Sequence, residues 1–167
     1  AAGYEKSRDV MRLNGFLGDL VGAPIALGEF CYQFHIFGEP SASQPWGWQL
    51  YGHHLCLTCF MLGGQMTLTP AFMGAEPRYA DAGAHAGLRL FEDEERMGLQ
   101  LLRGFTQTQR RKAIIHATTV ADHLPPGRHQ AADGMSFGGS FKDNAIVPYE
   151  GVSGAELDNR QRRALLD

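Results

Sequence analysis

The spacing of hydrophobic positions changes along the chain, from a helical period at the start to strand-like alternation in the middle. In residues 4–22, Val10, Leu13 and Leu17 recur three or four positions apart, which predicts an amphipathic helix. Residues 29–37, with the sequence EFCYQFHIF, alternate instead and predict a strand with one apolar and one mixed face. The first part of the chain is therefore expected to pass from a helix into a sheet.

The strongest strand signal lies in the run WGWQLYGHHLCLTCFMLGGQMTLTP. We expect two strands here, 46–61 and 65–69, joined at Gly63–Gly64, because adjacent glycines accept the positive φ angles of a tight hairpin turn. Pro70 is expected to end the second strand, and residues 71–87 are expected to form a loop of small residues. The middle of the chain therefore predicts a long hairpin.

Helical spacing returns after this loop. We expect helices at 91–103, 107–121 and 154–166, with Thr106 and Ser153 as N-caps of the last two. Between them the chain is rich in glycine and is expected to be irregular, apart from a short strand at residues 145–147.

Together these elements predict an α+β fold: an antiparallel sheet with a long central hairpin (46–69) and helices before and after it. The 167 residues fit a single domain, residues 1–167.

Composition and charge exclude several classes of protein. With 44% apolar and 20% charged residues, the chain is too apolar to be disordered. No apolar run approaches the roughly 18 residues of a membrane span. The net charge of −3 gives no basic excess for nucleic acid. The chain begins without the pattern of a signal peptide, so a cytoplasmic location is expected.

The candidate chemistry centres on two adjacent histidines, His53 and His54, in the expected strand. Successive strand residues point to opposite faces, so the pair would not chelate one ion unless Gly52 forms a bulge. His53 would share its face with Gln49 and Tyr51, and this polar company favours it as the residue that faces a pocket. The alternative interpretation is a structural pair of hydrogen-bonded histidines.

Further polar residues that could complete a site follow the hairpin. Glu76 and His85 lie in the expected loop, while Glu92 and Glu95 share one face near the start of the next helix. Such side chains are usually exposed at the surface. Each is therefore a candidate site residue only in combination with the histidines.

The longest continuous runs, PWGWQLYGHHLCLTCFMLGGQMTLTPAFMGAEP and GLRLFEDEERMGLQLLRGFTQTQRRKAI, resemble an uncharacterised family known as domain of unknown function 3500. The resemblance extends over most of the chain. Its most specific parts are Trp-Gly-Trp followed by Gly-His-His, and the Thr-Pro-x-Phe-x-Gly turn.

The resemblance implies that family members are about twice as long as this chain and carry further histidines in their second half. The chain is then expected to be the first half of a longer fold that another chain completes. If a site took ligands from both halves, His53 and His54 would be this chain's metal ligands. Three or four nitrogen and oxygen ligands would suit zinc, iron or manganese.

Two functions from different classes follow. The first is a metal-dependent enzyme, hydrolytic or oxidative, that acts on a small organic substrate. His53 would be its ligand or acid/base, and Glu76 or Glu95 its second ligand or general base.

The alternative is a non-catalytic subunit or interaction domain that completes its sheet with a partner chain. That partner would be a second polypeptide carrying the C-terminal half, or another copy in a homo-oligomer. Neither nucleic acid nor a membrane is an expected partner.

Overall fold

The computed structural model describes residues 2–129, 144 and 146–166, and the chain divides into two compact units. The first unit is Ala1–Glu92 and the second is Asp93–Asp167. The single domain expected over residues 1–167 stays a prediction. Of the strand expected at 145–147, residue 145 lies outside the described residues, and Ile146 and Val147 have no regular structure.

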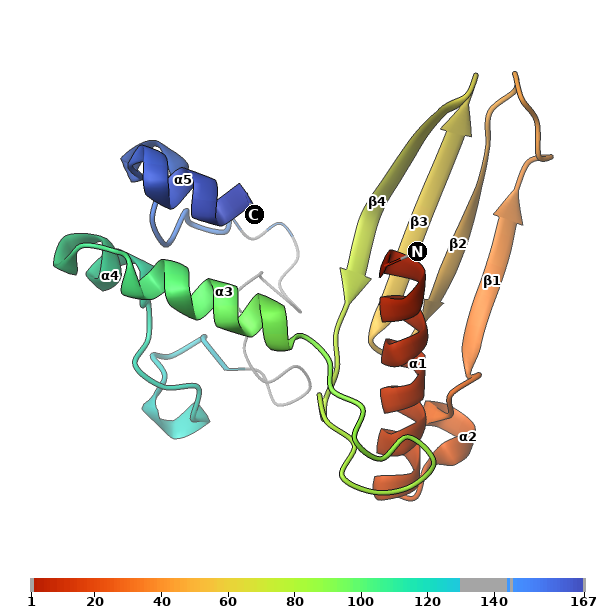
Figure 1. Cartoon of the computed structure of the whole chain (residues 1–167), viewed down its shortest axis with the longest axis horizontal. Helices are drawn as coiled ribbons and strands as arrows, with labels where there is room; N and C mark the ends of the chain where they lie inside the picture. The colour runs from red at the N-terminus through yellow and green to blue at the C-terminus, as the bar shows by residue number, and fades with distance from the viewer. Residues whose placement is uncertain (1, 130–143, 145, 167) are drawn as a thin grey trace. The chain divides into compact units, whose positions relative to one another are not determined.

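The first unit is a four-stranded antiparallel sheet preceded by two helices, in the strand order β1-β2-β3-β4 (Figure 1). Its elements are α1 (Ala2–Leu20), α2 (Pro24–Leu27), β1 (Tyr32–Phe37), β2 (Trp46–Gly52), β3 (Leu55–Leu62) and β4 (Gln65–Met73). With further helices after the sheet, the α+β arrangement predicted from the sequence is confirmed.

Two tight turns connect the central strands, and the sequence predicted one of them. Gly63 and Gly64 join β3 to β4 with φ angles of 55° and 80°, as expected for a turn that requires positive φ at both positions. The second turn is His53–His54, which joins β2 to β3. The expected continuous strand 46–61 is therefore wrong, because the chain reverses at the two histidines.

The strand β4 continues through Pro70 to Met73, which corrects the prediction that this proline ends the strand at residue 69. Proline cannot donate to a ladder of backbone hydrogen bonds, so it is tolerated on an edge strand or at a bulge. Here both conditions hold: β4 is an edge strand, and its register with β3 shifts between Leu57 and Cys59.

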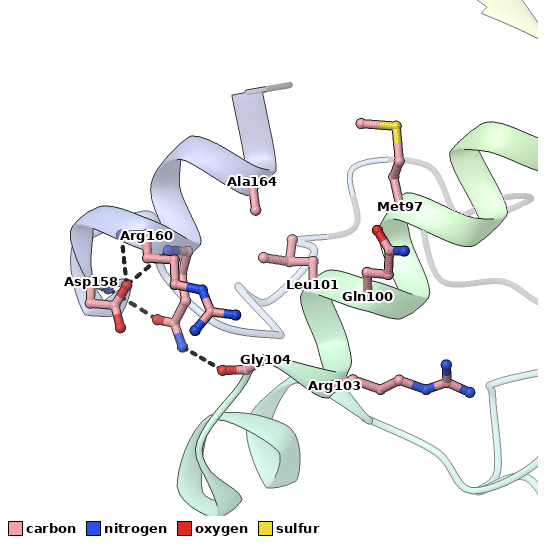
Figure 2. A pocket seen from close by; sticks show the side chains of 9 residues that line it. Met97, Gln100, Leu101, Arg103, Gly104, Asp158, Arg160 and Ala164 are labelled. Atoms are coloured by element: carbon pink, nitrogen blue, oxygen red, sulfur yellow. Dashed lines mark hydrogen bonds between the residues drawn. The ribbon is translucent and has the colours of Figure 1, made fainter.

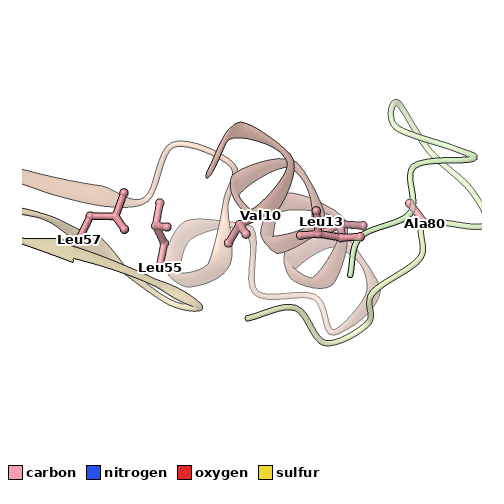
Figure 3. Packing of buried hydrophobic residues seen from close by; sticks show 6 residues of the cluster. Val10, Leu13, Leu55, Leu57 and Ala80 are labelled. Carbon is pink, nitrogen blue, oxygen red and sulfur yellow. The ribbon is translucent and has the colours of Figure 1, made fainter. Parts of the chain in front are cut away.

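The core of the first unit forms where α1 packs on one face of the sheet (Figure 3). Val10 and Leu13 of α1 meet Leu55 and Leu57 of β3, and all four are buried. Ala80, from the loop after β4, is completely buried in the same cluster. Backbone hydrogen bonds across this loop, such as Ala80 N–H to the Leu88 carbonyl, hold it in place.

The second unit is helical in its described residues. Its elements are α3 (Glu92–Arg103), α4 (Gln107–Ala113), the short 3₁₀ helices η1 (Ala121–His123) and η2 (Gly154–Glu156), and α5 (Asn159–Leu166). Thr106 caps α4 as predicted, but α4 ends at residue 113 instead of 121. Ser153 caps η2 only, and α5 begins after Asp158, so the expected helix 154–166 is interrupted.

Candidate functional site

The His53–His54 turn brings two imidazole rings together at one end of the sheet. Because the residues occupy a turn, their side chains do not diverge as they would in a strand, and the ring centroids lie 3.9 Å apart. His54 adopts a φ of 63°, a left-handed conformation that is uncommon for residues other than glycine, although histidine adopts it more often than most. The expectation that the two rings face opposite sides of a strand is therefore wrong.

Contacts from other elements hold this turn. The Tyr32 hydroxyl donates to the His53 carbonyl at 2.7 Å, and the Gly74 N–H donates to the His54 carbonyl at 2.8 Å. Burial, with a smaller contribution from the charge of Cys31, raises the pKa of Tyr32 to about 12. The hydroxyl therefore keeps its proton and remains a donor at neutral pH.

The ring of His53 is oriented by Asn14 on α1, a side chain that is 1% exposed. The Asn14 side-chain nitrogen donates to the carbonyls of Leu27 at 2.9 Å and Gly28 at 3.4 Å. This leaves Oδ1 of the amide facing Nδ1 of His53 at 2.7 Å. Because an amide oxygen only accepts, Nδ1 of His53 is the donor.

This hydrogen bond decides which nitrogen of the neutral ring is available. With the proton on Nδ1, Nε2 of His53 carries the lone pair, in the form that binds a metal ion or accepts a proton. His53 is exposed to solvent, so the available nitrogen belongs to an accessible side chain.

The surroundings of the His54 ring lower its pKa below the ordinary value. Burial is the largest cause that lowers its pKa, the neighbouring His53 lowers it further, and Glu76 opposes both. The electrostatic effect of Glu76 shows that this predicted site residue belongs to the surroundings of the histidine turn. The structure therefore brings the rings of His53 and His54 together, with Glu76 close enough to influence the pKa of His54.

Glu95, the other carboxylate predicted for this site, is on α3 in the second unit, whereas the histidine turn is in the first. Among the described residues, no group of three or more histidine, cysteine, aspartate and glutamate side chains is arranged to hold a metal ion. Since catalytic zinc sites use three protein ligands and structural sites four, His53 and His54 alone are an incomplete set.

Sequence reasoning missed Asn14, although its position gave a signal. Asn14 lies four residues after Val10, on the apolar side of the predicted helix, where a polar amide requires a partner. A second missed contact is Glu29, whose carboxylate lies 2.8 Å from Nε2 of His85. This pair connects the loop after β4 to the segment before β1.

The sheet itself offers a different kind of candidate site along β1. None of the four strands contains aspartate, glutamate, lysine or arginine. By its register, Phe34 of β1 lies on the same face as Leu50 and Leu57, the face on which α1 packs. Phe34 is nevertheless 59% exposed and Ile36 is 54% exposed.

Fold and site together define an α+β domain with a histidine turn and an open, uncharged sheet edge. The chain belongs to the family described as Protein of unknown function (DUF3500), whose model matches residues 1–167. No curated protein and no solved structure matches the chain significantly. Among the described residues, no helix has the length and apolarity required to cross a membrane.

Proposed function

We propose that the chain is an interaction domain that completes its sheet by adding an extended apolar strand of a partner chain to the β1 edge. The observation that carries this proposal is the unprotected state of β1. Among the residues that the structure describes, the backbone of β1 pairs only with β2, on one side, so the donors and acceptors of its other side are available to another strand.

The two edges of the sheet differ in how they resist pairing. Natural proteins protect edge strands with proline, charged side chains or bulges. The edge strand β4 contains Pro70 and a shift of register, whereas β1 contains neither proline nor a charged residue. This difference supports β1 as the edge that would accept the partner strand.

The chemistry of the partner follows from the side chains beside that edge. Phe34 and Ile36 continue the apolar face beyond the residues that α1 buries. A partner strand with apolar residues at alternate positions would cover these two side chains and continue the face. No charged residue of β1 would repel or attract it, so the partner strand is expected to be uncharged.

Sedimentation of the purified chain at rising concentrations tests this proposal. An open apolar edge pairs with any available strand, so the isolated chain is expected to self-associate. Ile36→Lys should shift the chain to the monomer, because it places a charge on the apolar face that the side chains of the partner strand would cover. Amide hydrogen exchange should show slower exchange in β1 as the chain associates.

Met66→Lys is the matched control, because it places the same charge on the exposed apolar surface of the opposite edge strand, β4. It should leave the association unchanged. A chain that remains a stable monomer at every concentration, or one that Met66→Lys dissociates as readily as Ile36→Lys, would contradict the assignment of the partner to β1.

The second candidate function is the metal-dependent enzyme on a small organic substrate, and the Asn14–His53 hydrogen bond favours it. Metal-binding histidines ordinarily donate their other ring nitrogen to an oxygen acceptor, as His53 does here. His53 and His54 would supply two ligands, and the partner chain a third. Metal identity, substrate and a cytoplasmic location stay predictions within this proposal.

Zinc titration of protein purified without a histidine tag tests the second candidate. We expect weak binding by the isolated chain, lost in His53→Ala and retained in His35→Ala, which removes an exposed histidine of β1. Binding of equal strength in both variants would exclude the turn as a metal site.

A further inference from the structure

The second unit contains a cavity of about 540 Å³ between α3 and α5 that belongs neither to the histidine turn nor to the sheet edge (Figure 2). Its size falls within the roughly 300–1,000 Å³ of small-molecule sites. Met97 and Leu101 of α3 and Ala164 of α5 give it an apolar wall. Arg103 and Arg160 supply positive charge.

The two arginines of the cavity differ from their neighbours in having no partner among the described residues. In the same unit, Arg162 donates to the Gly154 and Ala155 carbonyls and Arg163 to the Asn159 carbonyl. The guanidinium groups of Arg103 and Arg160 make no comparable hydrogen bond or ion pair to a described residue. Two unpaired cations beside an apolar wall favour an anionic ligand.

The one carboxylate that lines the cavity is already engaged. Asp158 accepts the backbone N–H groups of Arg160 and Gln161, each at 2.8 Å, and so caps the start of α5. The Asp158 carboxylate interacts with these backbone groups, and among the described residues it forms no ion pair with Arg103 or Arg160. The cavity therefore keeps an excess of positive charge.

The walls of the cavity are fixed by a buried amide network. The Gln161 side chain donates to the Gly104 carbonyl at 3.0 Å, which joins α5 to the end of α3 (Figure 2). Gln161 and Gln109 also donate to each other, both at 3.0 Å. A site held in this way is formed before its ligand arrives, which reduces the entropic cost of binding.

We propose that this cavity binds a small organic carboxylate. Its carboxylate would pair with Arg160, and its apolar body would lie on Met97, Leu101 and Ala164. The planar guanidinium matches a carboxylate with two parallel hydrogen bonds. The apolar wall distinguishes such a ligand from an inorganic anion, which would leave that wall uncovered.

Titration of the ¹⁵N-labelled chain with octanoate, followed by NMR, tests the proposal. Amide shifts should change together at residues 97–104 and 158–164. Arg160→Gln should weaken binding by about tenfold or more, since hydrogen bonds between charged groups contribute roughly that much. Arg163→Gln is the matched control, because it removes the same charge from the same helix outside the cavity, and it should leave the affinity unchanged.

Two further probes separate the sources of affinity. Octanol has the apolar body without the charge, and inorganic phosphate has charge without the apolar body, so both should bind more weakly than octanoate. Equal binding of either probe, shifts located in the sheet, or equal effects of the two arginine variants would overturn the proposal. Because the sheet edge is in the other unit, this result is independent of the function proposed above.

Discussion

Oδ1 of Asn14 lies 2.7 Å from Nδ1 of His53, a hydrogen bond between residues that are 39 positions apart in the chain. The same amide donates to two carbonyls at the end of α2, so one buried side chain connects α1, the α2 segment and the histidine turn. The stability of the first unit and the tautomer of the His53 ring therefore depend on the same residue.

Asn14→Leu should destabilise the first unit by about 1–3 kcal/mol, because the Leu27 and Gly28 carbonyls lose their donor. Urea unfolding followed by tryptophan fluorescence measures this, since both tryptophans lie in β2. The NMR shifts of the His53 ring nitrogens should show that the proton is no longer held on Nδ1. Asn14→Asp is the control that keeps the acceptor, and an unchanged tautomer in Asn14→Leu would refute the assigned orientation.

Because the pKa of His54 is lowered in the folded chain, the stability of the first unit should decrease as the pH falls. The unfolded chain gains a proton on His54 near the ordinary value of 6.5, whereas the folded chain gains it only at lower pH. The contribution of His54 to the free energy of unfolding is therefore complete above pH 6.5. It declines as the pH falls from the pKa of the unfolded chain to the lower pKa of the folded chain.

The test compares urea unfolding from pH 7.5 to pH 5 in the wild type and His54→Asn. Asparagine tolerates the left-handed conformation, so the turn should remain. The variant should lose less stability than the wild type over this range. An identical pH dependence in both proteins would show that His54 makes no contribution.

Leu13→Ala should destabilise the first unit by about 2–5 kcal/mol, because it removes a completely packed side chain between α1 and the sheet. Leu20→Ala is the control in the same helix, where the side chain is exposed, and it should change stability by less than about 0.5 kcal/mol. Urea midpoints measure both. Equal effects would contradict the packing of α1 on β3.

The buried pair Gln109–Gln161 should behave as one unit in mutagenesis. Either single change to leucine removes the two hydrogen bonds that the amides exchange and should cost about 1–3 kcal/mol, while the double variant should cost less than the sum. Amide hydrogen exchange in α4 and α5 is the measurement. Gln107→Leu, on the exposed side of α4, is the control, and strictly additive effects would argue against the pair.

The two turns of the sheet show what local sequence can and cannot predict. Gly63–Gly64 was predictable because glycine accepts positive φ without steric cost. His53–His54 was not, because apolar alternation continues on both sides and the pair contains no glycine or proline to mark a turn. The left-handed conformation of His54 accompanies contacts from Tyr32 and Gly74, which are distant in sequence.

The same distinction applies to the candidate site and the helix ends. His53, His54 and Glu76 were predictable as candidates from their residue types, whereas the role of Asn14 depends on carbonyls that only the folded chain places beside it. The Thr106 cap was predictable from its local pattern, but the end of α4 at Ala113 was not, since no glycine or proline marks it.

Pro70 has a consequence for how many molecules can join. A sheet that accepts a new strand at both edges can polymerise without limit. A sheet with one edge blocked stops after a single strand has been added at the other edge. With Pro70 in β4, the complex is expected to saturate at a fixed stoichiometry as concentration rises, and fibre growth would be blocked by an imino acid.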